Sequence, residues 1–244
     1  MRMKEDYMLN GQLKPGYNWQ ISTQNQYILD YTLHQRPTDT ATLPVHLESL
    51  KETTGTVPGA VVADAGYGSE QNYEYLENNG IEAFVKFNNF HKEQTSKWKE
   101  NPHRIENLHY NKERDCYYCP MGQAMTFIHE KTSKSEIGYL QVKRLYQAQN
   151  CQGCPMRGPC YKAKGNRTIE ANPRLIGYKE IIRERLNSER GKQYRSQRPV
   201  DVEGVFGNIK NNKGFRRFML RGMKKVEIEA GLLSLAHNLA KLSN

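Results

Sequence analysis

The stretch VVADAGYGSEQN, Val61 to Asn72, decides the fold that we predict for this chain. Together with Ala60, its start is a run of small apolar residues, which predicts a short buried strand over 60–63. Asp64 follows this strand directly and stands before a glycine-rich turn. In α/β sheets, reactive groups collect where a strand ends, because the turn exposes them. Asp64 is therefore predicted to be an acid at a rigid, accessible strand end.

Upstream of this stretch, the sequence predicts a hairpin and a helix. YNWQISTQNQYILDYTLH (17–34) alternates apolar and polar residues on both sides of a polar TQNQ turn, as a β-hairpin does. The segment 38–55 is predicted to be helical, with Pro44 near its start and Gly55 after its end.

Downstream, the pattern continues with a helix and a strand. Ser69 is a suitable N-cap, and Gly80 can take the left-handed conformation that ends a helix. IEAFVKF (81–87) is the next predicted strand. The order of these elements predicts an α/β fold in which helices pack on a mixed sheet.

The remaining chain divides into an insertion and a helical part. The 244 residues suffice for one large domain with an insertion. Residues 88–170 are polar, basic and aromatic in patches, hold all five cysteines and show little periodicity. After them YKEIIRERL, VDVEGVFGNIK and VEIEAGLLSLAHNLAKL each predict a helix. We therefore expect three parts, namely 1–87, 88–170 and 171–244.

The N-terminus and the lengths of the apolar runs indicate in which compartment of the cell the protein is expected. MRMKEDYMLN lacks the apolar segment of a signal peptide, and no apolar run approaches the roughly 18 residues of a membrane span. We expect a cytoplasmic protein without a membrane partner. Its cysteines are then reduced thiols or metal ligands, not disulfides.

The charge of the chain points to a polyanionic partner. The net charge is +10, and from 190 to 225 eleven Lys or Arg stand against two acids, Asp201 and Glu203. Basic side chains in such density favour nucleic acid over a merely basic surface. The phenylalanines that interleave with them are assigned to the core; they are Phe206, Phe215 and Phe218.

Within this run, one face of a predicted helix combines an acid and a lysine. If 200–210 is helical, Glu203, Gly207 and Lys210 share a face, since they are spaced by four and then three residues. Gly207 removes side-chain bulk between the two charges. The carboxylate suits a divalent metal, and the ammonium suits a phosphate of a nucleic acid strand lying across the helix.

These motifs together resemble the later part of a bacterial insertion-sequence transposase of the DDE type, the transposase DDE domain family. The resemblance is carried by VVADAGYGSEQNYEYL, RPVDVEGVFGNIKNNKGFRRFMLRG and EAGLLSLAHNLAKL, and also by LKPGYNWQISTQNQYI and HQRPTDTATLPVHLE. It implies a ribonuclease H-like core in which two Asp and one Glu bind two Mg²⁺ or Mn²⁺ ions. It also implies metal-dependent cleavage and strand transfer of DNA, with a homodimer on DNA as a further option.

Carried over by position, the resemblance assigns individual residues. Asp64 matches the second Asp of the family and Glu203 its Glu. Tyr194, Arg198 and Lys210 resemble the family's tyrosine, arginine and lysine around that Glu. Arg216 and Arg217 belong to the basic run and are expected to contact DNA. The glycines after Asp64 are expected to leave room for the DNA.

The first Asp of the family has no counterpart in a predicted strand of this chain. Asp6 is the one acidic alternative of that type, but the sequence predicts no strand before it. We therefore expect the C-terminal part of a transposase, poorly stable alone because a central strand is missing, with weak or no activity. The alternatives are a non-catalytic DNA-binding remnant or regulator of transposition, and a nuclease with the same core.

The cysteines form two C-x-x-C pairs. These are Cys116 with Cys119 and Cys151 with Cys154, while Cys160 is a fifth thiol that could replace one of the four. Two such pairs in a cytoplasmic protein predict a tetrahedral Zn²⁺ site. The alternative is five ordinary free thiols.

Two further polar residues receive structural roles. Asp39 is interpreted as a helix cap and not as a metal ligand. His237 lies on the apolar face of the last predicted helix and is interpreted as a packed core histidine.

Overall fold

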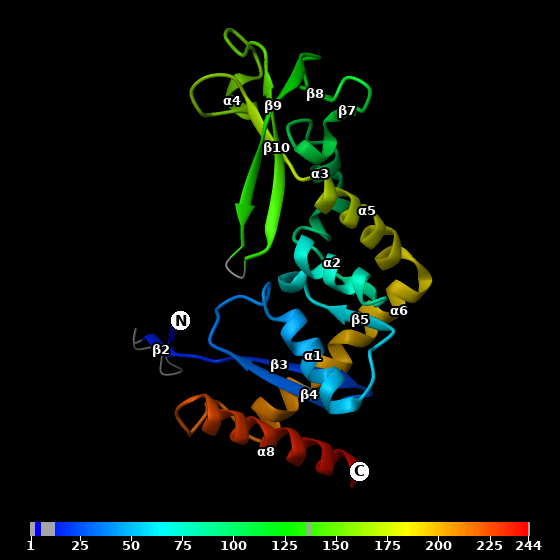
Figure 1. Ribbon diagram of the computed structural model, residues 1–244, viewed down its shortest axis with the longest axis vertical. Helices are drawn as coiled ribbons and strands as arrows, with labels where there is room; N and C mark the ends of the chain where they lie inside the picture. Colours follow the sequence, from blue (N-terminus) through cyan, green and yellow to red (C-terminus); the bar gives the residue numbers. More distant parts are fainter. Residues whose placement is uncertain (1–2, 6–12, 136–137, 244) are drawn as a thin grey trace. The chain divides into compact units, whose positions relative to one another are not determined.

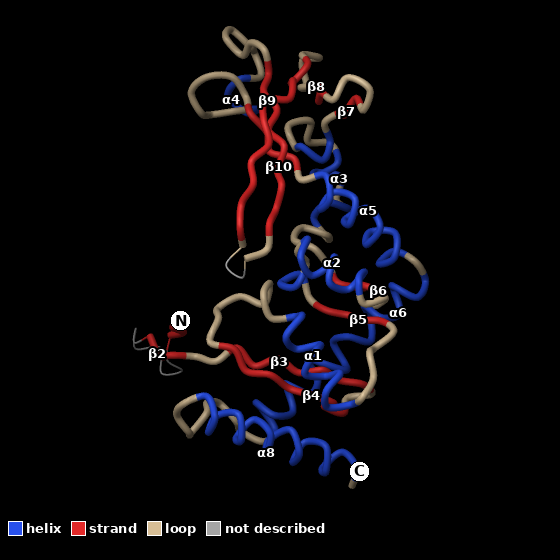
Figure 2. Tube along the Cα trace, viewed as in Figure 1, coloured by secondary structure: helices blue, strands red, loops and turns tan. Residues whose placement is uncertain are grey.

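The computed structural model describes residues 3–5, 13–135 and 138–243, which belong to two compact units (Figures 1 and 2). Unit 1 combines Met1–Phe87 with Ile182–Asn244, and unit 2 is Asn88–Ile181. The second boundary falls inside one helix, α5 (Pro173–Asn187).

The first half of unit 1 follows the predicted order of strands and helices. Its elements are β1 (Met3–Glu5), β2 (Leu13–Pro15), β3 (Asn18–Gln24), β4 (Tyr27–His34), α1 (Leu43–Thr54), β5 (Ala60–Ala63), η1 (Ala65–Tyr67), α2 (Glu70–Asn78) and β6 (Glu82–Val85). The second half is helical. It contains the end of α5, then α6 (Glu189–Arg198), η4 (Pro199–Glu203), α7 (Gly204–Gly207), η5 (Asn208–Asn212) and α8 (Met223–Leu242).

The predicted hairpin is confirmed. Strands β3 and β4 pair antiparallel from Asn18 opposite His34 to Gln24 opposite Tyr27. Asn25 and Gln26 turn the chain with φ values of 51° and 65°. Two successive positive φ angles match the right-handed twist of the strands and give a tight turn.

The predicted single mixed sheet is only partly present. Unit 1 contains an antiparallel pair, β3–β4, and a parallel pair, β5–β6, but among the described strands these pairs are separate sheets. Because β6 is the one partner of β5 among the described strands, β5 is half-buried along its length and not buried as its apolar sequence suggested. The fold is thus mixed α/β.

The predicted helix ends are confirmed except for the start of α1, which begins at Leu43 and not at 38. Pro44 lies in the first turn of α1, and Gly55 ends that helix with φ 70°. The Ser69 hydroxyl accepts a hydrogen bond from the Asn72 amide at 3.3 Å at the start of α2. Gly80 follows that helix with φ 67°, a conformation that glycine adopts without steric cost.

The structure changes the interpretation of Asp39 and of the segment before Asp6. The Asp39 carboxylate does not cap α1; it accepts hydrogen bonds from Asn18 at 2.6 Å and Gln20 at 3.2 Å. The N-cap residue of α1 is Thr42. A short strand, β1, does precede Asp6, contrary to the sequence interpretation, and Asp6 itself lies outside the described residues.

An aromatic cluster joins the hairpin to the helices of the second half. The Trp19 ring on β3 lies 5.7 Å from Phe206, 6.1 Å from Phe215 and 5.7 Å from Phe218, measured between ring centroids. Beside it Val205 and Ile209 are buried against Ile28. The three phenylalanines are half-buried, and Phe215 packs against this buried cluster, so their assignment to the core is confirmed in part.

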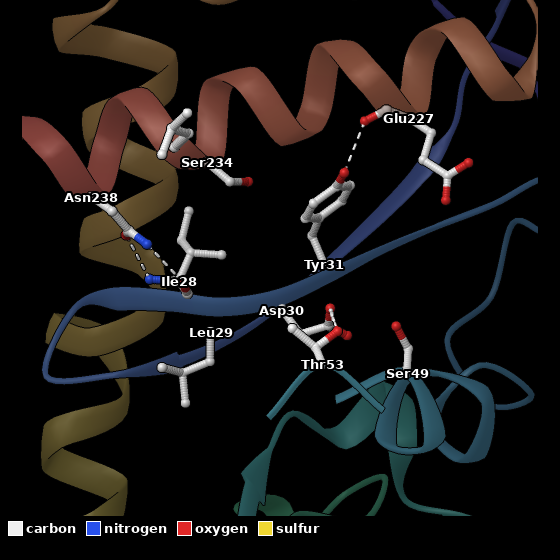
Figure 3. Close-up of a pocket in the computed structure, with 10 residues that line it drawn as sticks. Ile28, Leu29, Asp30, Tyr31, Ser49, Thr53, Glu227, Ser234 and Asn238 are labelled. Carbon is white, nitrogen blue, oxygen red and sulfur yellow. Dashed lines mark hydrogen bonds between the residues drawn. The ribbon is translucent and has the colours of Figure 1, made fainter. Parts of the chain in front are cut away.

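Helices α1 and α8 pack on opposite faces of β4 (Figure 3). On the α8 side, the buried His237 ring places Nε2 2.9 Å from the Gln26 carbonyl oxygen, to which it donates a hydrogen bond. This confirms the interpretation of His237 as a packed core histidine.

Unit 2 forms a sheet that the sequence analysis did not predict. Its strands are β7 (His109–Asn111), β8 (Cys116–Tyr118), β9 (Ala124–Lys134), β10 (Leu140–Ala148) and β11 (Thr168–Ala171), with short helical turns η2 (Lys92–Gln94), α3 (Ser96–Lys99), η3 (Ile105–Asn107) and α4 (Arg157–Cys160). The five strands are antiparallel, and each pairs with its neighbours in the chain. The sheet buries its own apolar cluster, which includes Tyr117, Met125 and Tyr146.

A polar network lies between the hairpin and α1. The buried His46 of α1 contacts the Ser22 hydroxyl through Nε2 at 2.8 Å and the Thr32 hydroxyl through Nδ1 at 2.9 Å. The buried Asp30 carboxylate lies 4.0 Å from the same ring. Burial lowers the pKa of His46 to about 4, although Asp30 opposes this shift. The imidazole is therefore neutral in the folded protein at pH 7.

We expect this histidine to make unit 1 sensitive to acid. Unfolding returns the His46 pKa from about 4 to its ordinary value near 6.5, so between these values the unfolded state binds more protons. The contribution of His46 to the free energy of unfolding should be fully present above pH 6.5. About 2–3 kcal/mol of stability should be lost as the pH drops to 4. Urea unfolding across this range measures the slope. The His46→Gln variant should reduce it; an unchanged slope would contradict the assignment.

Candidate functional site

Asp64 lies where β5 ends and the one-turn helix η1 begins. Its backbone is extended, with φ −74° and ψ 168°, and its carbonyl accepts a hydrogen bond from the Tyr67 amide at 3.1 Å. The Asp64 side chain is 54 % exposed. The strand end therefore presents an accessible carboxylate, as the sequence predicted.

One guanidinium group joins this strand end to a distant helix. Arg198, the last residue of α6, places Nη2 3.1 Å from Asp64 Oδ2 and Nη1 2.9 Å from Glu203 Oε1. The Arg198 side chain is only 13 % exposed, whereas that of Glu203 is 62 % exposed. Two predicted acids, 139 residues apart in the chain, thus meet at opposite ends of one cation.

The helix that carries Arg198 and Glu203 is not a regular α-helix. Pro199 has no amide hydrogen to donate and cannot continue the α-helical ladder. The chain widens there into the π-helical turn η4, in which the Gly204 amide bonds to the Pro199 carbonyl. A second π-helical turn, η5, follows α7. Such turns are frequent at functional sites, since they re-aim side chains on a rigid helix.

Two residues beside the acids were not assigned to the site from sequence. Burial raises the pKa of the Tyr67 hydroxyl far above its usual value; the charges of Asp39 and Asp64 add to the rise and Arg198 opposes it. Asp39 also lies against Gly66, in the turn after Asp64. Both residues belong to the surroundings of the two acids, which only the folded chain brings together.

The family of the chain follows from a match to this region. The model of the family described as Transposase DDE domain matches residues 118–243, just over half of the chain. The chain belongs to this family. No curated protein and no solved structure matches it.

The range matched by the transposase family model covers only part of the predicted site. It contains Glu203 and its neighbours Tyr194, Arg198 and Lys210, but Asp64 lies before its first residue. The link between Asp64 and the matched part therefore rests on the contact through Arg198.

Tyr194 and Lys210, two of the remaining predicted residues, contact groups other than the two acids. The Tyr194 ring packs on Phe84 at 4.9 Å, and its hydroxyl accepts a hydrogen bond from Arg190 at 3.2 Å. Lys210 places its ammonium 5.1 Å from the centre of the Phe206 ring. Arg216 and Arg217 are exposed in the segment between η5 and α8.

The glycines after Asp64 serve the packing of the turn. A Cβ atom on Gly68 would overlap the Lys86 carbonyl oxygen and lie 2.7 Å from the Phe87 Cα atom. A Cβ atom on Gly66 would lie 2.9 Å from the Asp39 carboxylate. The expectation that these glycines leave room for DNA is therefore wrong: protein atoms occupy that space.

The described residues contain no ready metal centre. Over 3–5, 13–135 and 138–243, no three His, Cys, Asp or Glu side chains converge closely enough to hold an ion. Among these residues, Asp64 and Glu203 are thus two acids without a third.

The same holds for the predicted zinc site. All five cysteines are free thiols. Cys116 is buried in β8, and Arg167 donates hydrogen bonds to two others, from its amide to Cys151 at 3.3 Å and from Nη1 to Cys160 at 3.1 Å. The structure gives no support to a tetrahedral Zn²⁺ site.

In the part of the chain that is described, no helix has the length and apolarity to cross a membrane.

We expect Gly68 to be essential for the turn that presents Asp64. The Gly68→Ala substitution adds a methyl group where Lys86 and Phe87 leave no space, so the free energy of unfolding should fall by about 1–3 kcal/mol. Urea unfolding measures the loss. Gly59→Ala is the matched control, because a Cβ atom there meets nothing within 4 Å. Equal stability of the two variants would contradict the packing role of Gly68.

Proposed function

We propose that the chain contributes to metal-dependent DNA cleavage and strand transfer of an insertion sequence, with Asp64 and Glu203 as two of the metal-ligating acids. The observation that carries this proposal is the contact of both acids with Arg198, at 3.1 Å and 2.9 Å. Membership of the transposase DDE domain family supplies the reaction class. A protein of this kind acts on DNA in the cytoplasm.

The same proposal gives the strands a ribonuclease H-like arrangement. The antiparallel pair β3–β4 and the parallel pair β5–β6 would be two parts of one mixed sheet. A further strand between β3 and β5 would complete the sheet and carry the third acid. Among the described strands, each of these pairs has edges without a partner strand, and this supports the interpretation, because unpaired backbone groups favour pairing with an added strand.

The donor chemistry of the site fits a hard divalent cation. Asp64 and Glu203 offer carboxylate oxygens, which Mg²⁺ and Mn²⁺ prefer, and both side chains are more than half exposed. Arg198 now supplies the positive charge between them, so it would have to turn away when an ion binds. A pair of bound metals supplies Lewis-acid stabilisation of the attacking and leaving oxygens of phosphoryl transfer.

The cationic residues of the chain would hold the DNA. Arg198, once released from the acids, is a planar donor suited to two oxygens of one phosphate. Lys210, Arg216 and Arg217 are exposed and extend the positive surface along the second half of unit 1. They would supply affinity for the DNA backbone without reading its sequence.

We expect Arg198 to compete with a metal ion for the two acids. Replacing it by Gln removes a cation from between the carboxylates, so the affinity for Mn²⁺ should rise, by up to about fivefold for an ion pair of this exposure. Asp64→Asn and Glu203→Gln should each lower it. Electron paramagnetic resonance of free Mn²⁺ during titration measures all three. Equal affinity of the wild type and the two acid variants would contradict a joint metal site.

We expect the basic surface to bind DNA through phosphates. Alanine at Lys210, Arg216 or Arg217 should weaken binding to all sequences alike, and each substitution should reduce the slope of log affinity against log salt by about one, because one phosphate fewer is neutralised. Fluorescence anisotropy at several salt concentrations gives this slope. Lys51→Ala is the matched control, because Lys51 is an exposed lysine on α1. If it reduced the salt slope as much as Lys210→Ala does, the DNA would not be bound by the basic surface of Lys210, Arg216 and Arg217 in particular.

A second function, a non-catalytic DNA-binding remnant or regulator, is favoured by one observation: no third acid joins Asp64 and Glu203 among the described residues. In either case we expect the chain alone to show weak or no strand transfer with Mg²⁺ or Mn²⁺. Incubation with labelled element ends tests this. Robust strand transfer that Asp64→Asn removes would overturn the expectation of weak activity and exclude the remnant.

A further inference from the structure

Helix α8 carries two apolar faces, and only one of them is buried within unit 1. The first face packs on β4 and contains Val226, Ala230, Ser234 and His237, all buried. The second is exposed over the length of the helix. Its members, which we call the α8 seam, are Ile228, Leu232, Leu235, Leu239 and Leu242, with exposed fractions of 60, 62, 56, 56 and 71 %.

The spacing of the α8 seam is that of a helix pair. Its residues follow one another at intervals of four, three, four and three, which is the heptad pattern of two helices that pack with interlocking side chains. A helix that covers one sheet needs a single apolar stripe. The second stripe, in water, costs solubility unless another surface covers it.

From this pattern we propose that the α8 seam binds the α8 seam of a second copy of this chain, in an antiparallel helix pair. The inference goes beyond the proposed function, because it needs neither DNA nor metal. A self-complementary surface of this kind closes a two-fold symmetric dimer.

The area of the seam is sufficient for a specific, moderate association. Each of the five side chains would remove roughly 100 Å² of apolar surface from water. Taken over both copies, this gives about 1,000 Å², the lower limit for a specific protein–protein interface. The dimer should therefore be reversible.

The charges at the ends of α8 decide the orientation. Lys224 and Lys225 are exposed in its first turn, and no acid accompanies them in that turn. In a parallel pair, these lysines would face their own copies. In an antiparallel pair, Lys225 lies beside the C-terminal end of the second α8, whose carbonyl groups carry partial negative charge. Lys241 in that last turn donates a hydrogen bond to Gln26 Oε1 of its own chain at 3.3 Å, at the turn of the hairpin and not on the α8 seam. The heptad positions then place Leu232 opposite Leu235 of the second copy, and Leu239 opposite Ile228.

The neighbouring strand edge favours pairing of helices over pairing of strands. A pocket of about 360 Å³ opens along β4 between α1 and α8, and Leu235 of the seam is among its lining residues (Figure 3). At its end, Asn238 accepts a hydrogen bond from the Ile28 amide at 2.9 Å and donates one to the Ile28 carbonyl at 2.8 Å. The amide of Asn238 thus occupies the position at which a strand from another chain would bind.

Analytical ultracentrifugation of the full chain without DNA, from about 1 to 100 µM, tests this proposal. We expect a reversible monomer–dimer equilibrium. Leu235→Asp should raise the dissociation constant at least about tenfold, because it places a charge in the centre of the seam. Val45→Asp is the matched control, since Val45 is an exposed apolar residue on another helix, α1, with an exposed fraction of 57 %. It should leave the equilibrium unchanged, and circular dichroism verifies that both variants are folded.

Lys225→Ala tests the orientation. It should weaken an antiparallel dimer, because the helix end then lacks its neighbouring positive charge, and should strengthen a parallel one, because a repulsion is removed. A monomer at every concentration, or a dimer that Leu235→Asp leaves intact, would overturn the proposal.

Discussion

The arrangement of the candidate site depends on a single positive charge between two acids. Ion pairs between fully exposed side chains contribute little to stability, and the ion pairs of Arg198 are not of this kind. Its own side chain is 13 % exposed, while the acids that it joins reach solvent. Without a cation, the carboxylates of Asp64 and Glu203 would repel each other at this separation. The structure thus places a guanidinium group between the two acids, at the point where the proposed function requires a metal.

The apolar packing of unit 1 holds the two partners of this charge in place. Trp19 on the hairpin is packed among the aromatic side chains of the segment that follows Glu203, and Val205 and Ile209 are buried beside it. On the other side, Gly68 lets the turn after Asp64 lie directly on the end of β6. The helix with Glu203 and the strand end with Asp64 are thus fixed by separate packing interactions.

Local signals predicted much of unit 1, and the reasons are physical. The φ preferences of Gly55 and Gly80 and the hydroxyl of Ser69 act on their own neighbours, so the helix ends could be predicted. Asp64 was indicated by its position at a strand end and Glu203 by the helix face that it shares with Lys210, and the family resemblance added their roles and Arg198. The roles of Asp39 and Tyr67 depend on residues far away in the chain, and no local pattern indicates such interactions. In unit 2, the alternation of β10 is masked because Arg144 is paired with Asp115 at 2.7 Å and stands where an apolar residue would be expected.

The π-helical turn at Pro199 has a consequence for how this chain tolerates change in length. An α-helix advances by about 100° for each residue, and a wide turn accommodates one residue more than an α-turn does. The direction of the Glu203 carboxylate is hence set by the number of residues after Arg198 as much as by their identity. A one-residue deletion in this turn, such as removal of the exposed Val200, would keep every acid and every base of the site. It would let the turn close into an ordinary α-turn, in which Glu203 stands four residues after Arg198 and still faces it, so the wide turn is the place where this helix can lose a residue.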